Sequence, residues 1–153
     1  MSTRNRKRLW NTLLGVLLVL TLCFIWGNSL LSRENSAAFS GKVVELLTPI
    51  FSSLSMEGPD EHVIRKLAHF TEYAILGLEL AALFFINRGR SLKSIGYSAL
   101  CALAAGSADE TIQLFSGRAA MLKDILLDFS GALTGILLLW LLTLGQKKKS
   151  GLS

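Results

Sequence analysis

The chain alternates long apolar stretches with shorter polar segments. Each apolar stretch has roughly the 20 residues that a helix needs to cross about 30 Å of hydrocarbon. The four stretches run Leu9–Ile25, Leu67–Ile86, Ser94–Phe115 and Ile125–Leu144, within spans of about 9–29, 65–86, 94–115 and 124–144. No clear small-x-small cleavage site follows Trp26, which favours a retained first helix over a cleaved signal peptide. The pattern predicts an all-α integral membrane protein with four transmembrane helices in a single domain, residues 1–153.

A fifth element is predicted between the first and second spans, in segment 36–54. Its apolar residues recur at helical spacing, with Lys42, Glu45 and serines between them: Phe39, Val43, Leu46, Leu47 and Ile50. Pro49 should kink or end this helix, since proline cannot donate to the preceding turn. We interpret the segment as an amphipathic helix in the outer membrane interface. This helix has two alternative roles: it covers the outer end of the bundle, or it binds substrate.

The charged residues divide between the two sides of the predicted membrane. Three segments that share one side hold basic residues and no acid: Arg4, Arg6, Lys7, Arg8, Arg88, Arg90, Lys93, Lys147, Lys148 and Lys149. Ten of the 11 acidic residues fall on the other side: Glu34, Glu45, Glu57, Asp60, Glu61, Glu72, Asp109, Glu110, Asp124 and Asp128. The positive-inside rule then predicts that both termini are cytoplasmic.

Composition points to the same class of protein. The chain is 51% hydrophobic with a net charge of +5, and that charge comes from the cytoplasmic flanks. Anionic lipid headgroups explain such flanks. No basic patch interleaved with aromatic residues is present, so nucleic acid is not an expected partner. Cys23 and Cys101 lie inside apolar spans, and we predict that they are buried small hydrophobes rather than a disulfide or a metal pair.

Polar side chains gather at the outer ends of three predicted spans. A rise of 1.5 Å per residue places them at a similar depth in the outer leaflet. They are Lys66, His69, Glu72 and Tyr73 in the second span, Asp109, Glu110 and Gln113 in the third, Arg118 in the following loop, and Asp124 and Asp128 in the fourth. Ionisable groups inside a membrane are rare and mark functional sites by default. A purely structural alternative is a salt-bridged network in which Arg65, Lys66, Arg118 and Lys123 hold the helices in register.

Two further features concern architecture. Gly131 and Gly135 form a G-x-x-x-G face that lets helices approach closely, and the small residues of 104–108 suit it as a partner. Glu79 lies near the middle of the second span. We expect it to be protonated or hydrogen-bonded to a neighbour, with a proton-relay role as the less favoured reading.

The pattern resembles the VanZ-like membrane proteins over residues of about 10 to 144. The matching positions are Lys66-x-x-His69-x-x-Glu72-Tyr73-x-x-Leu76, Asp109-Glu110-x-x-Gln113, Arg118, Asp124 and Gly131-x-x-x-Gly135. Asp128 stands where many members have asparagine. The resemblance implies a role in the cell envelope of bacteria, and in founding members lowered susceptibility to the glycopeptide teicoplanin. It implies a phenotype and no particular reaction.

Three classes of site remain open. The first is a membrane-embedded enzyme acting on a lipid-linked or phosphate-bearing amphiphile at the outer leaflet. Its catalytic candidates are His69, Glu72, Asp109 and Glu110, and its substrate-binding candidates are Lys66, Tyr73, Gln113, Arg118, Asp124 and Asp128. Histidine exchanges protons near neutral pH and arginine binds phosphate in a bidentate manner, so these residue types suit proton transfer beside an anionic group.

The second class is a binding or exclusion protein that recognises an amphiphile, with segment 36–54 gripping its acyl chains. The third is a metal site built from His69, Glu72, Asp109, Glu110 and Asp124, which suits iron, manganese or zinc. Only one imidazole is available in the cluster, so the sequence favours no metal and no cofactor. Membrane lipids are the expected partners, and removing His69 should separate an enzyme from a binder.

Overall fold

The computed structural model describes residues 2–30, 41–46, 48–49, 60–116 and 122–149. These ranges contain four long helices and no strand, which confirms the predicted all-α class. The helices are α1 (Thr3–Leu30), α3 (Glu61–Arg88), α4 (Leu92–Phe115) and α5 (Leu122–Lys149). Each predicted apolar span lies within one of them.

The amphipathic helix predicted for 36–54 falls only partly on described residues. Residues 41–46 and 48–49 are helical, and the rest of the segment lies outside the described residues. Leu46, which the pattern assigns to the apolar face, is exposed. Whether the helix ends at Pro49 is not decided, because residues 50–59 also lie outside the described part.

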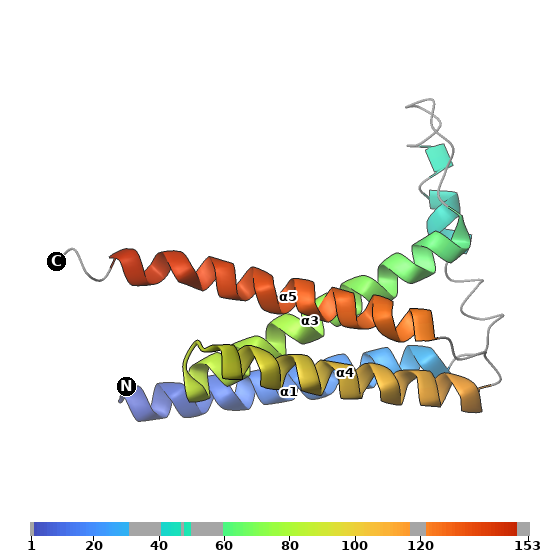
Figure 1. The fold of residues 1–153 in the computed structure, drawn as a ribbon. Coiled ribbons are helices and arrows are strands. Elements are labelled where there is room, and N and C mark those ends of the chain that lie inside the picture. The colour runs from blue at the N-terminus through green and yellow to red at the C-terminus, as the bar shows by residue number, and fades with distance from the viewer. Residues whose placement is uncertain (1, 31–40, 47, 50–59, 117–121, 150–153) are drawn as a thin grey trace.

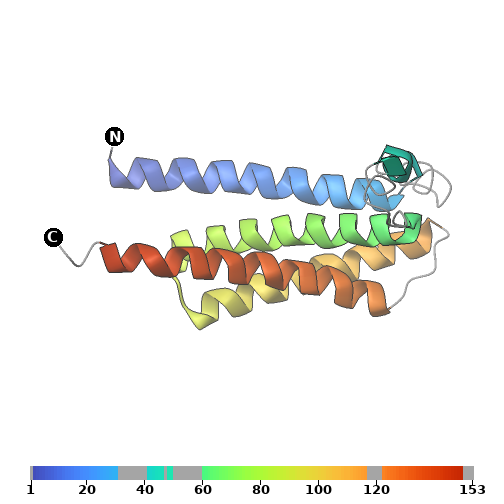
Figure 2. The same cartoon turned by 90° about the horizontal axis from the view of Figure 1, so that it is seen from above.

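Helix α3 is the centre of the bundle, since it packs against α1, α4 and α5. Its most extensive partner is α5. Figures 1 and 2 show the helices running lengthwise beside one another, with α1 and α5 on opposite sides of α3. The start of α1 and the end of α5 lie at the same end of the molecule (Figure 1). The chain therefore returns to its starting end, as an even number of antiparallel crossings requires.

Three of the helices, α1, α3 and the 122–144 part of α5, are long and apolar enough to cross a membrane. α4 is not among them, because the face that it buries is small and polar rather than apolar. That face consists of Ser94, Ser98, Ala102, Ala105, Gly106, Asp109, Glu110 and Gln113. The structure thus supports a membrane protein with three candidate spans, and a crossing by α4 stays a prediction.

Glycine determines how closely α3 and α5 approach. A Cβ atom added at Gly131 would collide with the carbonyl oxygen of Phe70, and one added at Gly135 with that of Ala74. Gly77 of α3 is equally tight against the backbone of α5. The predicted close-packing face at Gly131 and Gly135 is therefore present, but it packs on α3. The prediction that it faces residues 104–108 was wrong, since spacing along one helix does not identify its neighbour.

A tight turn joins α3 to α4 at the end that carries both termini. Gly89 ends α3 with a positive φ of 76°, a conformation that favours glycine. Ser91 then caps α4 by accepting a hydrogen bond from the backbone N–H of Ser94 at 3.2 Å. The short connection makes α3 and α4 antiparallel neighbours.

Cys23 and Cys101 are both free and exposed on the helix surface. The prediction that they are buried was wrong. In a membrane bundle, apolar and small residues serve the lipid-facing surface as well as the core, so an apolar context does not imply burial.

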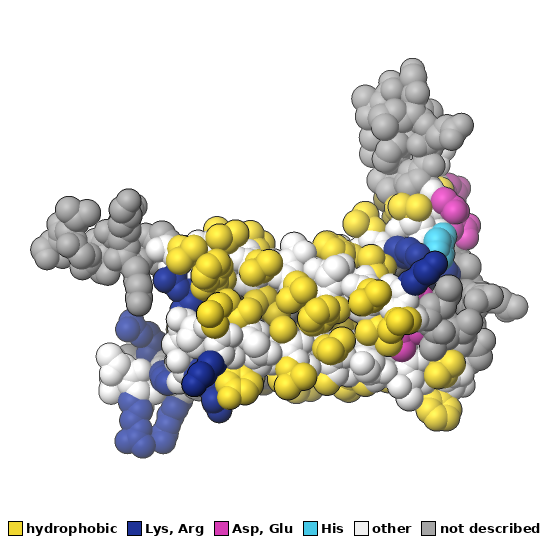
Figure 3. Space-filling model, in the orientation of Figure 1, with side chains coloured by type: hydrophobic (Ala, Val, Ile, Leu, Met, Phe, Trp, Pro, Cys, Tyr) yellow, Lys and Arg dark blue, Asp and Glu magenta, His cyan; other side chains and the backbone are white. Residues whose placement is uncertain are grey.

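The two ends of the bundle differ in charge. Figure 3 shows Lys and Arg side chains gathered at the end with both termini, whereas Asp, Glu and His side chains appear at the opposite end. Some basic side chains accompany the acids there (Figure 3). The division expected from the sequence is therefore present in the folded chain.

Candidate functional site

Three helices bring His69, Asp109 and Asp128 into direct contact at the acidic end of the bundle. His69 Nδ1 lies 3.9 Å from Asp109 Oδ2 and 3.8 Å from Asp128 Oδ1. The two carboxylates are buried, with 0% and 2% of the side chain exposed, whereas the histidine side chain keeps 17% exposure. We call these three residues the His–Asp–Asp centre. Each comes from a different helix, so only the folded bundle assembles it.

Gln113 and Ser29 support the Asp109 side of this centre. Gln113 Nε2 donates to Asp109 Oδ2 at 2.9 Å and also lies 3.4 Å from Ser29 Oγ, which accepts. Ser29 is fully buried in α1, and its carbonyl oxygen accepts from Ser116 Oγ at 2.9 Å. Helix α1 is thereby connected to the centre through α4. The spacing of four residues places Asp109 and Gln113 on one face of α4.

Tyr73 and Asp128 flank Gly106 of α4. A Cβ atom added at Gly106 would lie 3.7 Å from both the Tyr73 ring and Asp128 Cβ, and 4.0 Å from the Tyr73 hydroxyl. Tyr73 is fully buried, and its hydroxyl has no hydrogen-bond partner among the described residues. These are ordinary van der Waals distances, so Gly106 places both side chains near one point of α4. Glu110 is also buried, with 3% exposed.

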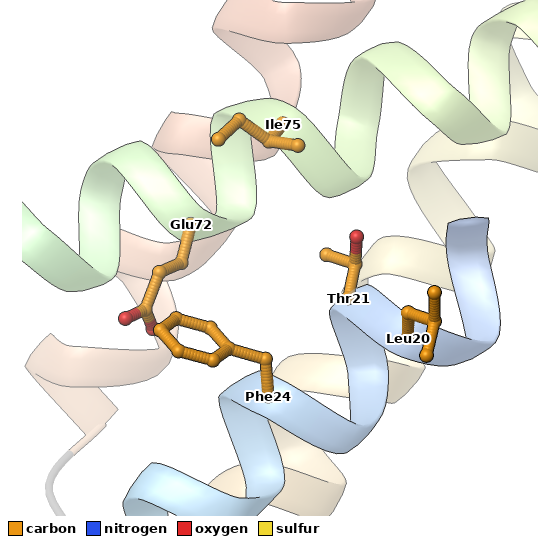
Figure 4. Close-up of a pocket in the computed structure, with 5 residues that line it drawn as sticks. All are labelled: Leu20, Thr21, Phe24, Glu72 and Ile75. Carbon is orange, nitrogen blue, oxygen red and sulfur yellow. The ribbon is translucent and has the colours of Figure 1, made fainter.

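Glu72 lies at the junction of α3 with α1. Its Oε1 accepts from Asn28 Nδ2 at 3.2 Å, and its Oε2 has no hydrogen-bond partner in the described part of the chain. It also lines a groove of about 360 Å³ between α1 and α3. The other lining residues are Leu20, Thr21, Phe24 and Ile75, and Figure 4 shows the Glu72 carboxyl group beside the Phe24 ring.

Polar pairs lock α1 to α3 in one register. Thr21 Oγ1 donates a hydrogen bond to Glu79 Oε1 at 2.9 Å. The buried Glu79 is therefore hydrogen-bonded to a neighbour, which is one of the two alternatives that we expected from the sequence. Asn28 Nδ2 donates to Glu72 Oε1 in the same way. Because the helices are antiparallel, Asn28 lies seven residues after Thr21 whereas Glu72 lies seven residues before Glu79. We call this set, completed near the termini by Asn11 with Asn87, the α1–α3 polar ladder. Its α1 members were not identified from the sequence, although Thr21 and Asn28 share a spacing of seven residues with Glu79 and Glu72.

The structure describes three of the four basic residues of the salt-bridged alternative. The Arg65 guanidinium contacts His62 Nδ1 at 2.9 Å. Within the described residues, neither Lys66 nor Lys123 forms an ion pair with a carboxylate, and Arg118 lies outside the described residues. Asp124 lies half-buried one helical turn before Asp128. Among the described residues, both buried carboxylates contact His69.

This arrangement allows two kinds of chemistry. One is acid–base chemistry, in which His69 exchanges protons beside Asp109 and Asp128, whose carboxylate oxygens lie 3.9 and 3.8 Å from its Nδ1. Alternatively, His69, Asp109 and Asp128 each offer one ligand atom for a metal ion, and these atoms all lie within 4.8 Å of one another. Asp128, which we expected only to bind substrate, belongs to both the acid–base arrangement and the candidate metal-ligand group. Glu72, Glu110 and Asp124 are not in that metal-ligand group.

A comparison with protein-family models matches residues 14–143 to a family described as VanZ/LLP1. The match covers most of the chain, including α3, α4 and the residues of the His–Asp–Asp centre. No curated protein and no solved structure matches the chain.

Proposed function

Because the chain belongs to the VanZ-like family, we propose that it is a multi-pass protein of the bacterial cell membrane with an outward-facing site for an envelope amphiphile. Both termini are cytoplasmic in this proposal, and α4 crosses the membrane as the fourth span. The positive-inside rule supports this orientation, because the end with both termini carries the basic residues. Oligomeric state plays no part in the proposal.

The proposal depends on one observation: His69 is partly exposed and contacts the buried carboxylates of Asp109 and Asp128. Burying a charge in a membrane bundle is costly, so two aspartates buried together indicate selection for something other than stability. The 17% exposure of His69 makes it the member of the centre that an amphiphile's polar head group can reach. In this proposal Tyr73 and Gln113 support the centre from inside the bundle, and Lys66 attracts an anionic head group. Arg118, which lies outside the described residues, keeps its predicted role in binding that group.

Family membership directs the first test to glycopeptides. We expect a teicoplanin-sensitive bacterium to become less susceptible when it expresses the wild-type chain, and to lose that protection with His69→Ala. His62→Ala is the matched control, because His62 is an exposed histidine that bonds to Arg65, outside the centre. Membrane levels of all three proteins are equalised by immunoblot before susceptibility is compared.

The outcomes separate the parts of this proposal. Protection that His62→Ala retains and His69→Ala loses supports a working site at His69. Equal protection by all three proteins contradicts that site. No protection by the wild type removes teicoplanin from the proposal, while the family assignment is unaffected.

A second candidate is an enzyme acting on a phosphate-bearing or lipid-linked amphiphile. The position of His69 favours it, since a partly exposed imidazole beside two buried carboxylates is suited to exchange protons with a substrate. Purified protein in vesicles containing a phospholipid should then release head group, and His69→Ala should lower turnover by about 10²–10⁴-fold. Saturable binding with no turnover would instead favour the binding or exclusion class.

A further inference from the structure

The His–Asp–Asp centre offers a donor set that the charge pattern alone did not reveal. One imidazole nitrogen and two carboxylate oxygens converge from α3, α4 and α5, with all three ligand atoms within 4.8 Å of one another. Imidazole together with carboxylate suits zinc, manganese and iron, whereas calcium and magnesium prefer oxygen ligands alone. The ligand chemistry therefore points to a divalent transition metal.

The spacing of the three atoms fits such an ion. His69 Nδ1 lies 3.8 and 3.9 Å from the two carboxylates, so a cation equidistant from all three atoms would lie roughly 2.2–2.5 Å from each. Zn²⁺ bonds to imidazole nitrogen and carboxylate oxygen measure about 2.0–2.2 Å. A contraction of a few tenths of an ångström, within reach of side-chain adjustment, would complete the coordination.

Asp128 provides independent support. Its side chain is 2% exposed, and its Oδ2 atom has no hydrogen-bond partner among the described residues. A buried carboxylate oxygen without a partner is costly, because it has lost its water and gained nothing in return. A cation beside Oδ1 and Oδ2 would remove that cost.

The surroundings also match those of a metal ligand set. Ligating carboxylates and histidines are normally oriented by hydrogen bonds from a second layer of residues. Here Gln113 donates to Asp109 and is itself connected to Ser29 of α1. The fully buried Tyr73 hydroxyl, also without a hydrogen-bond partner in the described residues, lies near Gly106, which Asp128 also approaches.

We propose that His69, Asp109 and Asp128 bind one divalent transition-metal cation, zinc or manganese. The inference deepens the proposed function and rests on it only for placing the site at the outer surface. The bound cation leaves positions open toward the exposed side of His69, where an anionic head group would coordinate it. His69 Nδ1 then donates its lone pair to the metal, so His69 positions the cation instead of exchanging protons.

The test measures metal binding directly on the full-length chain. Tag-free protein is purified in detergent, treated with chelator, and dialysed against Zn²⁺ or Mn²⁺ before metal content is measured by mass spectrometry. We expect one ion per chain for the wild type. Asp128→Asn keeps the side-chain shape but removes the charge, and should weaken binding at least about tenfold, since loss of an outer-shell partner alone costs about 10–100-fold. Asp60→Asn is the matched control, because Asp60 is exposed and makes no side-chain cap bond.

Folding is checked by circular dichroism and monodisperse elution, and His69→Gln is the second variant if Asp128→Asn fails to fold. One bound ion that Asp60→Asn retains and the centre variants lose supports the proposal. No bound ion, or equal binding by all variants, overturns it. The teicoplanin test does not depend on this measurement, so failure of the metal site and failure of the proposed function are distinguishable.

Discussion

The local environment of His69 defines the chemistry open to this chain. The side chain combines partial exposure with contacts to two buried carboxylates, whereas His62, seven residues earlier, contacts only Arg65 near the surface. The same residue type therefore has two different environments within two turns of one helix. Burial of the partners, and not the histidine itself, distinguishes the candidate site.

Tyr73 offers a test at the residue scale. Its hydroxyl is buried without a hydrogen-bond partner among the described residues, so Tyr73→Phe removes a desolvated polar group and keeps the ring. We expect the free energy of unfolding to stay unchanged or to rise by up to about 1 kcal/mol. Thermal unfolding in detergent measures this change. A loss of 1 kcal/mol or more, on the scale of a lost hydrogen bond, would show that the hydroxyl has a structural partner.

The same variant separates stability from function. Teicoplanin protection, measured at equal membrane levels, should fall for Tyr73→Phe if the hydroxyl contacts the ligand or a bound cation. Unchanged protection would remove Tyr73 from the site. Gln113→Leu is the useful comparison, because it removes a hydrogen bond to the buried Asp109 carboxylate and should lower both stability and protection.

The helices differ in the residues that they bury and in how they contact one another. α3 contacts every other long helix and supplies both His69 and the carboxylates of the α1–α3 polar ladder. α4 buries a strip of small and acidic residues, which explains both its low hydropathy and its position against the centre. α1 is largely exposed and is held by polar pairs, in contrast to the close backbone contact between α3 and α5.

Gly135 tests that contact at the element scale. A single methyl group there would meet the carbonyl oxygen of Ala74, so Gly135→Ala should destabilise the bundle by about 1–3 kcal/mol. Gly15→Ala is the matched control, since nothing lies within 4 Å of its added Cβ and alanine favours helix by up to about 1 kcal/mol. Thermal unfolding of both variants in detergent measures the difference. Equal stability would contradict the close α3–α5 packing.

The α1–α3 polar ladder gives a second prediction at this scale. Thr21→Val keeps the side-chain shape but removes the hydrogen bond to Glu79 Oε1, leaving a buried carboxyl group without that donor. We expect a loss of about 1–3 kcal/mol, measured by unfolding. Thr134→Val is the control, because Thr134 bonds only to the backbone of its own exposed helix face. A loss confined to Thr21→Val supports the ladder, and equal effects contradict it.

At the scale of the whole molecule, the two ends of the bundle differ in charge. Basic residues gather at the end with both termini and the His–Asp–Asp centre lies at the other, so the proposed orientation can be tested as a single property. Reporters fused after Gly89 and after Gln146 should be cytoplasmic, whereas a reporter after Ser116 should be extracytoplasmic. Opposite locations for Gly89 and Ser116 would establish that α4 crosses the membrane. An extracytoplasmic reporter after Gln146 would contradict the outward-facing site.

Much of the helical architecture was predictable because it depends on local pattern. Runs of apolar residues predict helices whatever their partners are, and all four predicted spans lie inside observed helices. The grouping of Asp109 with Gln113 follows from one turn of a single helix. The glycine face on α5 was also predictable, since it depends on spacing along one element.

What the sequence could not determine was the pairing of faces between helices. Hydropathy is nearly the same for a lipid-facing and a core-facing position, so it misplaced Cys23 and Cys101 and assigned the wrong partner to Gly131 and Gly135.

The sequence by itself determined four helix-forming spans, their division of charge and the family. The tertiary structure alone decided that Asp128, rather than Glu72 or Glu110, completes a ligand group with His69 and Asp109. The physical reason is that residues 19 to 59 positions apart meet only when three helices have chosen both their neighbours and their rotation. Close glycine contact fixes α5 against α3, and the hydrogen bond from Gln113 to Ser29 ties α4 to α1.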